Sequence, residues 1–403
     1  MSINLVTGGV PRGQDYFGRE SFIEQLWSRL RTDNVLLLAP RRYGKTGAMF
    51  QLLDNPRAPF RPIFINVEPI ESASDFMIEL LASLRQDDRL AQMTNKLWEG
   101  TKNIGKNLKK STAQIDIGMF KVHLREHTDV QENWALYGEK IIELLEKGQD
   151  RPLLMIDEFP IMVHHIAQHN IDELRRLMRW FRSARLTPKA KTRFLLGGSI
   201  NLMPTLDAIG LIGTVNDLAI EKLGPFDDET AFRFIKTAIT SQKMVVGEGV
   251  IQHIVDIIGT HVPYLLSVLV TSLFDRQRTK GKPITNEMVD DVFSTELLSR
   301  ATPFFNHYYR RLQDYYAGDE VRQAKVLLSL LSRAAGPVQR DTLYQEYLRV
   351  SGIPHTSDAL EKFLWLMQKL ENDFYVSLFE NKYDFSNRTI KLWWQTNYGY
   401  QFV

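Results

Sequence analysis

The stretch Asn34-Val-Leu-Leu-Leu-Ala-Pro-Arg-Arg-Tyr-Gly-Lys-Thr-Gly-Ala48 decides the fold of this chain. Its apolar run, residues 35–38, predicts a strand buried on both faces, as in a parallel sheet. The turn that follows fits the phosphate-cradling pattern G-x-x-x-x-G-K-[ST], except that Ala39 replaces the first glycine. A loop that leads from a strand into a helix directs backbone N–H groups and the positive end of the helix dipole at one point. In that arrangement Lys45 contacts the β- and γ-phosphates of a nucleotide and Thr46 holds Mg²⁺. An ordinary strand–turn–helix is the alternative.

Composition limits the class of protein. The 403 residues are 44% hydrophobic and 24% charged, which is typical of a globular chain of two or three domains. The net charge of +2 indicates neither a nucleic-acid binder nor a membrane-surface protein, so only local patches are informative. The absence of cysteine excludes disulfides, thiolate metal sites and cysteine catalysis. No apolar run approaches 18 residues and the N-terminus lacks a signal-peptide pattern, so we expect a cytoplasmic protein without membrane spans.

A second informative stretch is Arg151-Pro-Leu-Leu-Met-Ile-Asp-Glu-Phe159. It predicts a buried strand that ends in two carboxylates at the sheet edge where α/β proteins bind ligands. We expect Asp157 to hold Mg²⁺, usually through water, and Glu158 to polarise the attacking water. The alternative is that these carboxylates cap the next helix. A further strand, 194–200, places Ser199 where it can sense the γ-phosphate or the water.

The remaining pattern predicts three domains. Strands are also expected at 61–67 and 217–223, with helices near 22–30, 74–85, 133–147 and 171–185. From residue 227 the pattern is helical, near 227–240, 247–258, 262–275, 286–298 and 303–316. Helices near 320–334, 340–350 and 358–372, followed by strands 374–379 and 382–385, outline a winged helix. The expected division is a core at 1–223 with an insertion at 87–130, a lid at 224–318 and a winged-helix-like domain at 319–403.

Several local signals have two interpretations. In the insertion, lysines 102, 106, 109 and 110 share one helical face before an expected β-hairpin, and such a face is more often solvated than bound to nucleic-acid phosphates. The expected recognition helix of the winged helix carries Asp358, Glu361 and Glu371 against Lys362 and Lys369. It is not a basic surface, which favours packing or protein docking over reading of the DNA major groove. A set of three histidines includes a pair four residues apart that is able to share a metal ion: His164, His165 and His169. One helix carries an arginine-rich face, which is more often solvated or interdomain than phosphate-stabilising: Arg175, Arg176, Arg179, Arg182 and Arg185. The tryptophans in apolar patterns are expected in the core: Trp365, Trp393 and Trp394.

Other motifs complete a recognisable order. Tyr16-Phe-Gly-Arg-Glu20 is similar to the box that precedes the phosphate loop in STAND-type ATPases. Pro40-Arg-Arg-Tyr-Gly-Lys-Thr46 is similar to the Pro-Arg-Arg-x-Gly-Lys-Thr loop of their archaeal-ATPase-like branch. The same branch is matched by Asp157-Glu158-Phe159, Gly198-Ser199, Gly259…Pro263-Tyr-Leu-Leu266 and Tyr383-Asp-Phe385…Leu392-Trp393. Over nearly its whole length the chain therefore resembles this branch of the STAND/AAA+ P-loop ATPases, which is related to replication-initiator ATPases.

The resemblance implies an α/β fold, with a P-loop AAA+-like parallel sheet core, a helical lid and a C-terminal winged-helix domain. It implies that the Ser199 strand lies between the phosphate-loop strand and the Asp157–Glu158 strand. It also implies that Arg19 lies near the adenosine end of the nucleotide and that Pro263 packs against the base. The nucleotide contacts expected from it are Arg19, Pro40, Arg41, Arg42, Tyr43, Gly44, Lys45, Thr46, Gly47, Ser199 and Pro263.

The chain also departs from that pattern. Ala39 is an alanine where a glycine is usual, and alanine resists positive φ angles. The spacing from Gly259 to Pro263 is one or two residues longer than the pattern. No arginine lies between Ser199 and Leu223, where ring-forming AAA+ proteins place their arginine finger. These departures favour slow turnover over trans-activated hydrolysis in a closed ring.

The expected function is a Mg²⁺-dependent, ATP-binding and hydrolysing molecular switch. Glu158 and Lys45 are its expected catalytic residues, and Thr46 and Asp157 its metal ligands. ATP shifts the lid and winged helix toward a protein partner only as far as it binds one arrangement better than the other. The alternative is a DNA-binding initiator, transposition or regulatory ATPase that uses the winged helix and the basic insertion. A small-molecule phosphotransferase and a non-hydrolysing scaffold are further alternatives, and a homo-oligomer is left open.

Overall fold

The computed structural model describes residues 2–86, 121, 125, 131–199 and 202–402. The lysine face expected in the insertion lies outside the described residues, and so does the expected hairpin except for residue 121, which is helical. The chain forms two compact units, described separately below. The first unit comprises residues 19–39 and 45–223, and the second comprises residues 1–18, 40–44 and 224–403. The middle of the phosphate loop thus belongs with the second unit, while both of its ends belong to the first.

The first unit is built on a five-stranded parallel sheet. The strand order is β2(Phe60–Asn66), β3(Arg151–Asp157), β4(Arg193–Gly198), β1(Asn34–Leu38) and β5(Leu218–Lys222). All five residues of β1 are buried, because helices cover both faces of a parallel sheet. The expected position of the Ser199 strand, between the phosphate-loop strand and the Asp157–Glu158 strand, is confirmed.

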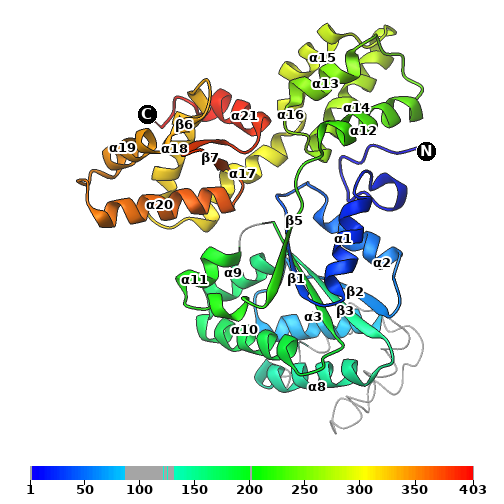
Figure 1. The fold of residues 1–403 in the computed structure, drawn as a ribbon, viewed down its shortest axis with the longest axis vertical. Helices are drawn as coiled ribbons and strands as arrows, with labels where there is room; N and C mark the ends of the chain where they lie inside the picture. Colours follow the sequence, from blue (N-terminus) through cyan, green and yellow to red (C-terminus); the bar gives the residue numbers. More distant parts are fainter. Residues whose placement is uncertain (1, 87–120, 122–124, 126–130, 200–201, 403) are drawn as a thin grey trace. The chain divides into compact units, whose positions relative to one another are not determined.

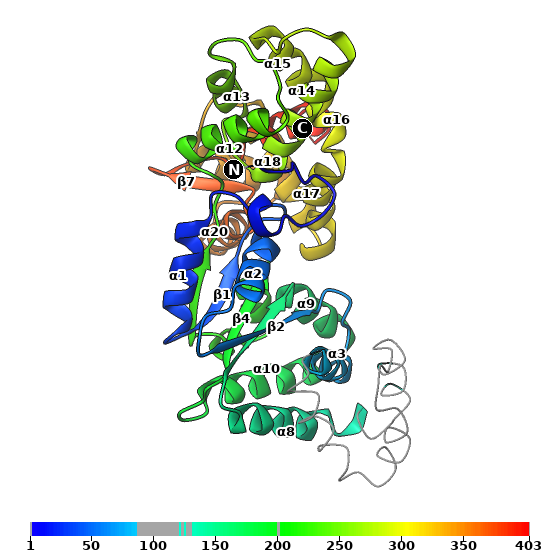
Figure 2. The same ribbon diagram turned by 90° about the vertical axis from the view of Figure 1, so that its right-hand side faces the viewer.

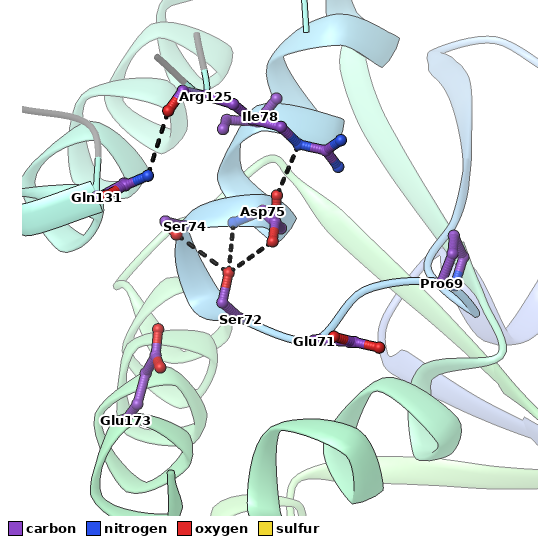
Figure 3. A pocket seen from close by; sticks show the side chains of 9 residues that line it. All are labelled: Pro69, Glu71, Ser72, Ser74, Asp75, Ile78, Arg125, Gln131 and Glu173. Atoms are coloured by element: carbon purple, nitrogen blue, oxygen red, sulfur yellow. Dashed lines mark hydrogen bonds and ion pairs between the residues drawn. The ribbon is translucent and has the colours of Figure 1, made fainter. Parts of the chain in front are cut away.

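Helices cover the two faces of this sheet (Figure 1). On one face lie α1(Glu20–Leu30) and α2(Lys45–Asp54), and on the other α3(Ala73–Arg85), α8(Trp134–Lys147), α9(Phe159–His169) and α10(Ile171–Leu186). The chain runs from β1 to the edge strand β2 and then returns across the sheet to β5, so right-handed crossovers place the two helix groups on opposite faces. Helices α3, α8 and α10 lie side by side (Figure 2). Phe181 of α10 meets the rings of Phe76 and Phe159, each at 5.0 Å, in the core beneath the sheet.

In the second unit, residues 228–315 form a helical region. Its helices are α12(Asp228–Ser241), α13(Val250–Ile258), α14(Pro263–Lys280), α15(Asn286–Val292), α16(Leu298–Arg300) and α17(Thr302–Tyr315). A π-helical turn at Phe293–Leu297 interrupts the single helix expected at 286–298. The N-terminal lead-in packs on α12, where Phe17 meets Phe234 at 5.7 Å. Gly18 has φ +68°, and a Cβ there would lie 2.5 Å from Thr230 Cγ2, so only glycine fits this turn.

The end of the chain is a winged helix. Its elements are α18(Glu320–Arg333), β6(Val338–Gln339), α19(Arg340–Ser351), α20(Ser357–Asn372), β7(Val376–Phe379), β8(Lys382–Phe385) and α21(Arg388–Tyr398). The strands form an antiparallel sheet in the order β6-β8-β7. Glu380 and Asn381 both have positive φ, 46° and 65°, as a tight two-residue hairpin turn requires. The expected fold class is therefore confirmed, while the exact division into three domains stays a prediction.

The structure also departs from the sequence interpretation. Trp393 and Trp394 are buried, but Trp365 is 37% exposed, so its assignment to the core is wrong. Arg185 is not part of a solvated face, because it is buried and binds Asp217 through two nitrogens, at 2.7 and 2.9 Å. Helices α11(Leu202–Ala208) and α21 and strand β6 were not predicted as elements, and α9 was expected only in the alternative in which Asp157 or Glu158 caps the next helix. Within the described residues, no group of three or more His, Asp or Glu is arranged to hold a metal ion. None of the helices described is both long enough and apolar enough to cross a membrane.

Candidate active site

Three neighbouring strands bring the predicted catalytic residues together. Strands β1, β4 and β3 are adjacent and parallel, so their C-terminal ends meet at one edge of the sheet. Lys45 and Thr46 begin α2 beyond the loop that follows β1, whereas Asp157 ends β3 and Glu158 follows it. Ser199 follows β4. All five residues belong to the first unit and form one hydrogen-bonded network.

Lys45 is the centre of this network. It is 5% exposed, and its Nζ forms ion pairs with Asp157 Oδ1 and, at 3.1 Å, with Glu158 Oε1. Burial lowers the pKa of Lys45, but the nearby Glu158 and Asp157 carboxylates raise it by more, so the net pKa lies above the usual value. The ammonium group therefore stays charged. Thr46 Oγ1 donates a hydrogen bond of 2.6 Å to Asp157 Oδ2. A hydroxyl beside a carboxylate is the set of hard oxygen donors that suits Mg²⁺.

Glu158 adopts an unusual backbone conformation. Its φ of 60° and ψ of 34° are left-handed, which costs a non-glycine residue about 1 kcal/mol or more. Although it stands at the N-cap position of α9, its side chain makes no capping bond. Its Oε2 instead accepts hydrogen bonds from Ser199 Oγ at 2.8 Å and Ser199 N at 3.3 Å. Glu158 therefore does not cap α9, and its carboxylate faces Lys45 and Ser199. The other part of the capping alternative holds, because Asp157 Oδ1 accepts the backbone N–H of Glu158 at 3.1 Å.

The phosphate loop does not need glycine at position 39. Ala39 is fully buried, is not among the residues with positive φ, and donates its N–H to Gly198 O at 3.2 Å. Positive φ occurs instead at Arg42, 70°, and at Gly44, 101°. A side chain at position 44 would also crowd the Tyr16 ring, since its Cβ would lie 3.1 Å from Cε2. The departure at Ala39 is thus compatible with the loop conformation.

The other residues predicted to contact a nucleotide are divided between the two units. Pro40 and Tyr43 are buried, Arg41 and Arg42 are exposed, and Gly47 is buried within α2. Arg19, also buried, directly precedes α1 in the first unit. Pro263 is the first residue of α14 in the second unit. Contact of these residues with a nucleotide stays a prediction.

Sequence reasoning missed Gly197 in β4. A Cβ there would lie 2.4 Å from Met49 Cε, 3.0 Å from Asp157 Oδ1 and 3.4 Å from Lys45 Cδ. Glycine at this position therefore lets the strand backbone approach the carboxylate and the lysine stem. The double glycine at the end of an otherwise apolar strand was a readable signal, because glycine inside a strand often marks a close approach.

Comparison with known proteins identifies the class of fold. No protein-family model matches the chain, and no curated protein matches it in sequence. Its structure is similar to a Walker-type ATPase of Pyrococcus abyssi, with a TM-score of 0.62 and 16% identity over 96% of this chain and 99% of that chain. It is also similar to the ORC2 protein of Aeropyrum pernix in its ADPNP–ADP complexes, with a TM-score of 0.55 and 11% identity over 95% of this chain and 92% of that chain. The chain therefore has the AAA+ P-loop ATPase fold, and the motif-based resemblance is confirmed at the level of the fold.

Proposed function

We propose that this chain is a Mg²⁺-dependent ATPase that works as a slow molecular switch. The observation that carries the proposal is the network in which Lys45 and Thr46 meet Asp157 and Glu158 at the C-terminal edge of the sheet. A cation that binds phosphates, two oxygen donors for a metal and a carboxylate for the attacking water are what phosphoryl transfer to water requires. The shared fold supports it, because the similar ORC2 protein was solved with ADPNP and ADP.

The binding roles follow from charge and position. Lys45 exchanges its carboxylate partners for the β- and γ-phosphate oxygens, and Thr46 and Asp157 hold Mg²⁺. When bound, the ion neutralises negative charge on the phosphate oxygens. Loop residues 40–44 and Gly47 surround the phosphates, while Arg19 and Pro263 contact the adenosine. The ligands are therefore ATP and ADP with Mg²⁺.

Glu158 and Ser199 supply the catalytic and sensing groups. Glu158 takes the proton of the attacking water, a role that contributes about 10²–10⁴-fold in rate. Ser199 holds the Glu158 carboxylate through its hydroxyl and N–H and reads the γ-phosphate. Turnover is slow because Ser199 competes with water for the Glu158 carboxylate. Residues 199–223 contain no arginine to donate to a neighbouring copy, so the proposal does not include trans-activated hydrolysis in a closed ring.

The partner that we propose is a protein, not DNA. The lysines of α20 are already paired, Lys362 with Asp358 and Lys369 with Glu320, each at 2.8 Å. Its exposed side chains include the apolar Leu360, Leu364 and Trp365. Binding to DNA rests on cations that neutralise phosphates, and this helix offers few. The lid and winged helix are therefore proposed to report the nucleotide state to a protein.

ATP turnover by the purified chain, measured with and without duplex DNA, tests this proposal. Lys45→Ala should abolish ATP binding, whereas Glu158→Gln should keep binding and lose about 10²–10⁴-fold in turnover. Glu139→Gln, an exposed carboxylate on α8, is the matched control and should change nothing. Failure of the wild-type chain to bind ATP would overturn the proposal. Turnover raised several-fold by DNA would replace the protein-partner reading with the DNA-dependent one.

A further inference from the structure

The two exposed arginines of the phosphate loop contact helices of the second unit. Arg41 Nη1 lies 3.4 Å from Nδ1 of His307 in α17. The Arg42 guanidinium lies over the Tyr264 ring of α14, 5.0 Å from its centroid, and its Nη1 donates to Gly9 O at 3.4 Å. A guanidinium over an aromatic face is an attractive cation–π contact. Residues 40–44 belong to the second unit, whereas Ala39 and Lys45 belong to the first.

Helix α17 is in turn packed against the winged helix through aromatic rings. Phe305 stacks on Trp393 of α21, with centroids 5.4 Å apart and ring planes at 13°. Tyr308 meets Tyr375 edge to face at 5.6 Å. On the other side, Phe304 packs against Tyr264, the residue that holds Arg42, at 5.6 Å. The same turns of α17 therefore touch both the loop-binding side chains and the winged helix.

Buried polar contacts also link α17 to the winged helix. Arg311 of α17 is 1% exposed and pairs with Asp373 at 3.2 Å. Tyr316 donates its hydroxyl to Asp373 Oδ2 at 3.0 Å, and Tyr375 donates its hydroxyl to Tyr308 O at 2.6 Å. Separating a buried ion pair leaves an uncompensated charge, which is strongly unfavourable. These contacts join helix α17 to the segment that leads into β7.

We propose that α17 couples the phosphate loop to the winged helix, with His307 and Tyr264 as the positioning residues that hold Arg41 and Arg42. This inference rests on the proposed function, since it names the contacts through which a bound nucleotide changes the arrangement of the winged helix. A phosphate is a much stronger partner for a guanidinium than a neutral imidazole or an aromatic ring. ATP therefore draws the arginines away from α17 and α14, and their release lets α17 and the winged helix take up a second arrangement.

The contact between His307 and Arg41 is one that ATP can replace. Burial, with the positive charges of Arg311 and Arg41, lowers its pKa to about 3, so the imidazole stays neutral. A neutral ring can accept the Arg41 N–H at Nδ1, but it adds no ionic attraction to that hydrogen bond. The contact is thus strong enough to position Arg41 and weak enough to be exchanged for a phosphate.

The test uses the full chain and two measurements, ATP affinity by calorimetry and amide hydrogen exchange of residues 373–385 with and without ATP. In the wild type, ATP should change exchange in this segment at least threefold. In His307→Phe this response should be lost while ATP still binds, and His307→Gln, which keeps a hydrogen-bond acceptor, should restore it. Arg310→Ala, an exposed residue on the same helix, is the control and should respond as the wild type.

A double-mutant cycle keeps the coupling falsifiable if one variant folds poorly. The effects of Arg41→Ala and His307→Phe on ATP affinity should be non-additive by about 2–10-fold. If they are additive, or if His307→Phe keeps the full exchange response, the coupling is overturned and the ATPase proposal stands. If the wild-type chain binds ATP without any change in segment 373–385, the coupling alone fails. If it binds no ATP, the proposed function fails, and the coupling with it.

Discussion

Replacing Gly197 by alanine tests whether the geometry of the active site depends on a close approach by β4. The new Cβ would meet Met49 Cε at 2.4 Å and Asp157 Oδ1 at 3.0 Å. The first distance is impossible for real atoms, so the end of the Met49 side chain must move. The second requires the carboxylate to yield by a few tenths of an ångström. Because Gly197 lies in a central strand, the backbone itself has little freedom to retreat.

Two effects of different size follow. Overpacking of this kind costs about 1–3 kcal/mol of stability, so the Tm should fall by roughly 2–4 °C for each kcal/mol lost. Displacing Asp157 should also weaken binding of Mg²⁺ and ATP by about tenfold, equal to about 1.4 kcal/mol. The double variant Gly197→Ala with Met49→Leu removes the contact with Met49 Cε at nearly constant volume. It should therefore recover most of the Tm and little of the affinity.

Thermal unfolding and calorimetric titration with Mg²⁺ and ATP measure both quantities. Gly213→Ala is the matched control, because the Cβ nearest approach there is an ordinary 3.9 Å, to Arg182 Nη1, and its Tm should stay within about 1 °C. An unchanged Tm and an unchanged affinity in Gly197→Ala would refute the reasoning. Recovery of full affinity in the double variant would show that Met49, and not Asp157, transmits the effect.

Three further predictions concern buried ionisable side chains. Arg185→Leu leaves Asp217 unpaired and should cost about 3–5 kcal/mol in free energy of unfolding by urea, whereas Arg175→Leu, in an exposed pair, should change the midpoint little. Lys45→Met leaves two carboxylates without their cation and should destabilise the nucleotide-free protein by about 3 kcal/mol, and an unchanged midpoint would contradict the observed ion pairs. The pKa of His307 falls from 6.5 to about 3 on folding, so only the unfolded state gains a proton as the pH falls below 6.5. Stability should therefore drop by about 2 kcal/mol between pH 7 and pH 5, and His307→Gln should abolish this part of the acid sensitivity in urea titrations at the two pH values.

Most of the first unit and the names of its central site residues could be predicted because the signals are local. An apolar run long enough for a buried strand, followed by a loop with Gly44, Lys45 and Thr46, marks its own place in a parallel sheet. The run that ends in Asp157 does the same. Once these strands are expected to be parallel, their carboxyl ends must meet at one edge. The bounds of α9 were not predicted, because the helix starts directly after Glu158, whose left-handed conformation no local pattern indicates.

Packing decided what the local patterns left open. The arginine-rich helix α10 reads as one polar face, yet Arg185 is buried because Asp217 and Thr214 O happen to lie opposite it. Trp365 follows the apolar spacing of a core residue, yet it is partly exposed because α20 buries the neighbouring positions 363, 366 and 367 instead. Whether such a side chain is buried or exposed depends on the residues that pack against it, and those residues are distant in sequence.

The sequence by itself determined most strands and helices of the first unit, the phosphate loop and the identity of the residues that can bind phosphate and a metal. These properties follow from hydrophobic periodicity and from short motifs, which act over a few residues. Only the tertiary structure decided that Lys45 pairs with both carboxylates, that Ser199 holds Glu158, that Gly197 must be glycine and that Arg41 reaches His307, 266 residues away. Contacts at such separations depend on how whole elements pack, because their geometry is set by the complete core and not by any one segment.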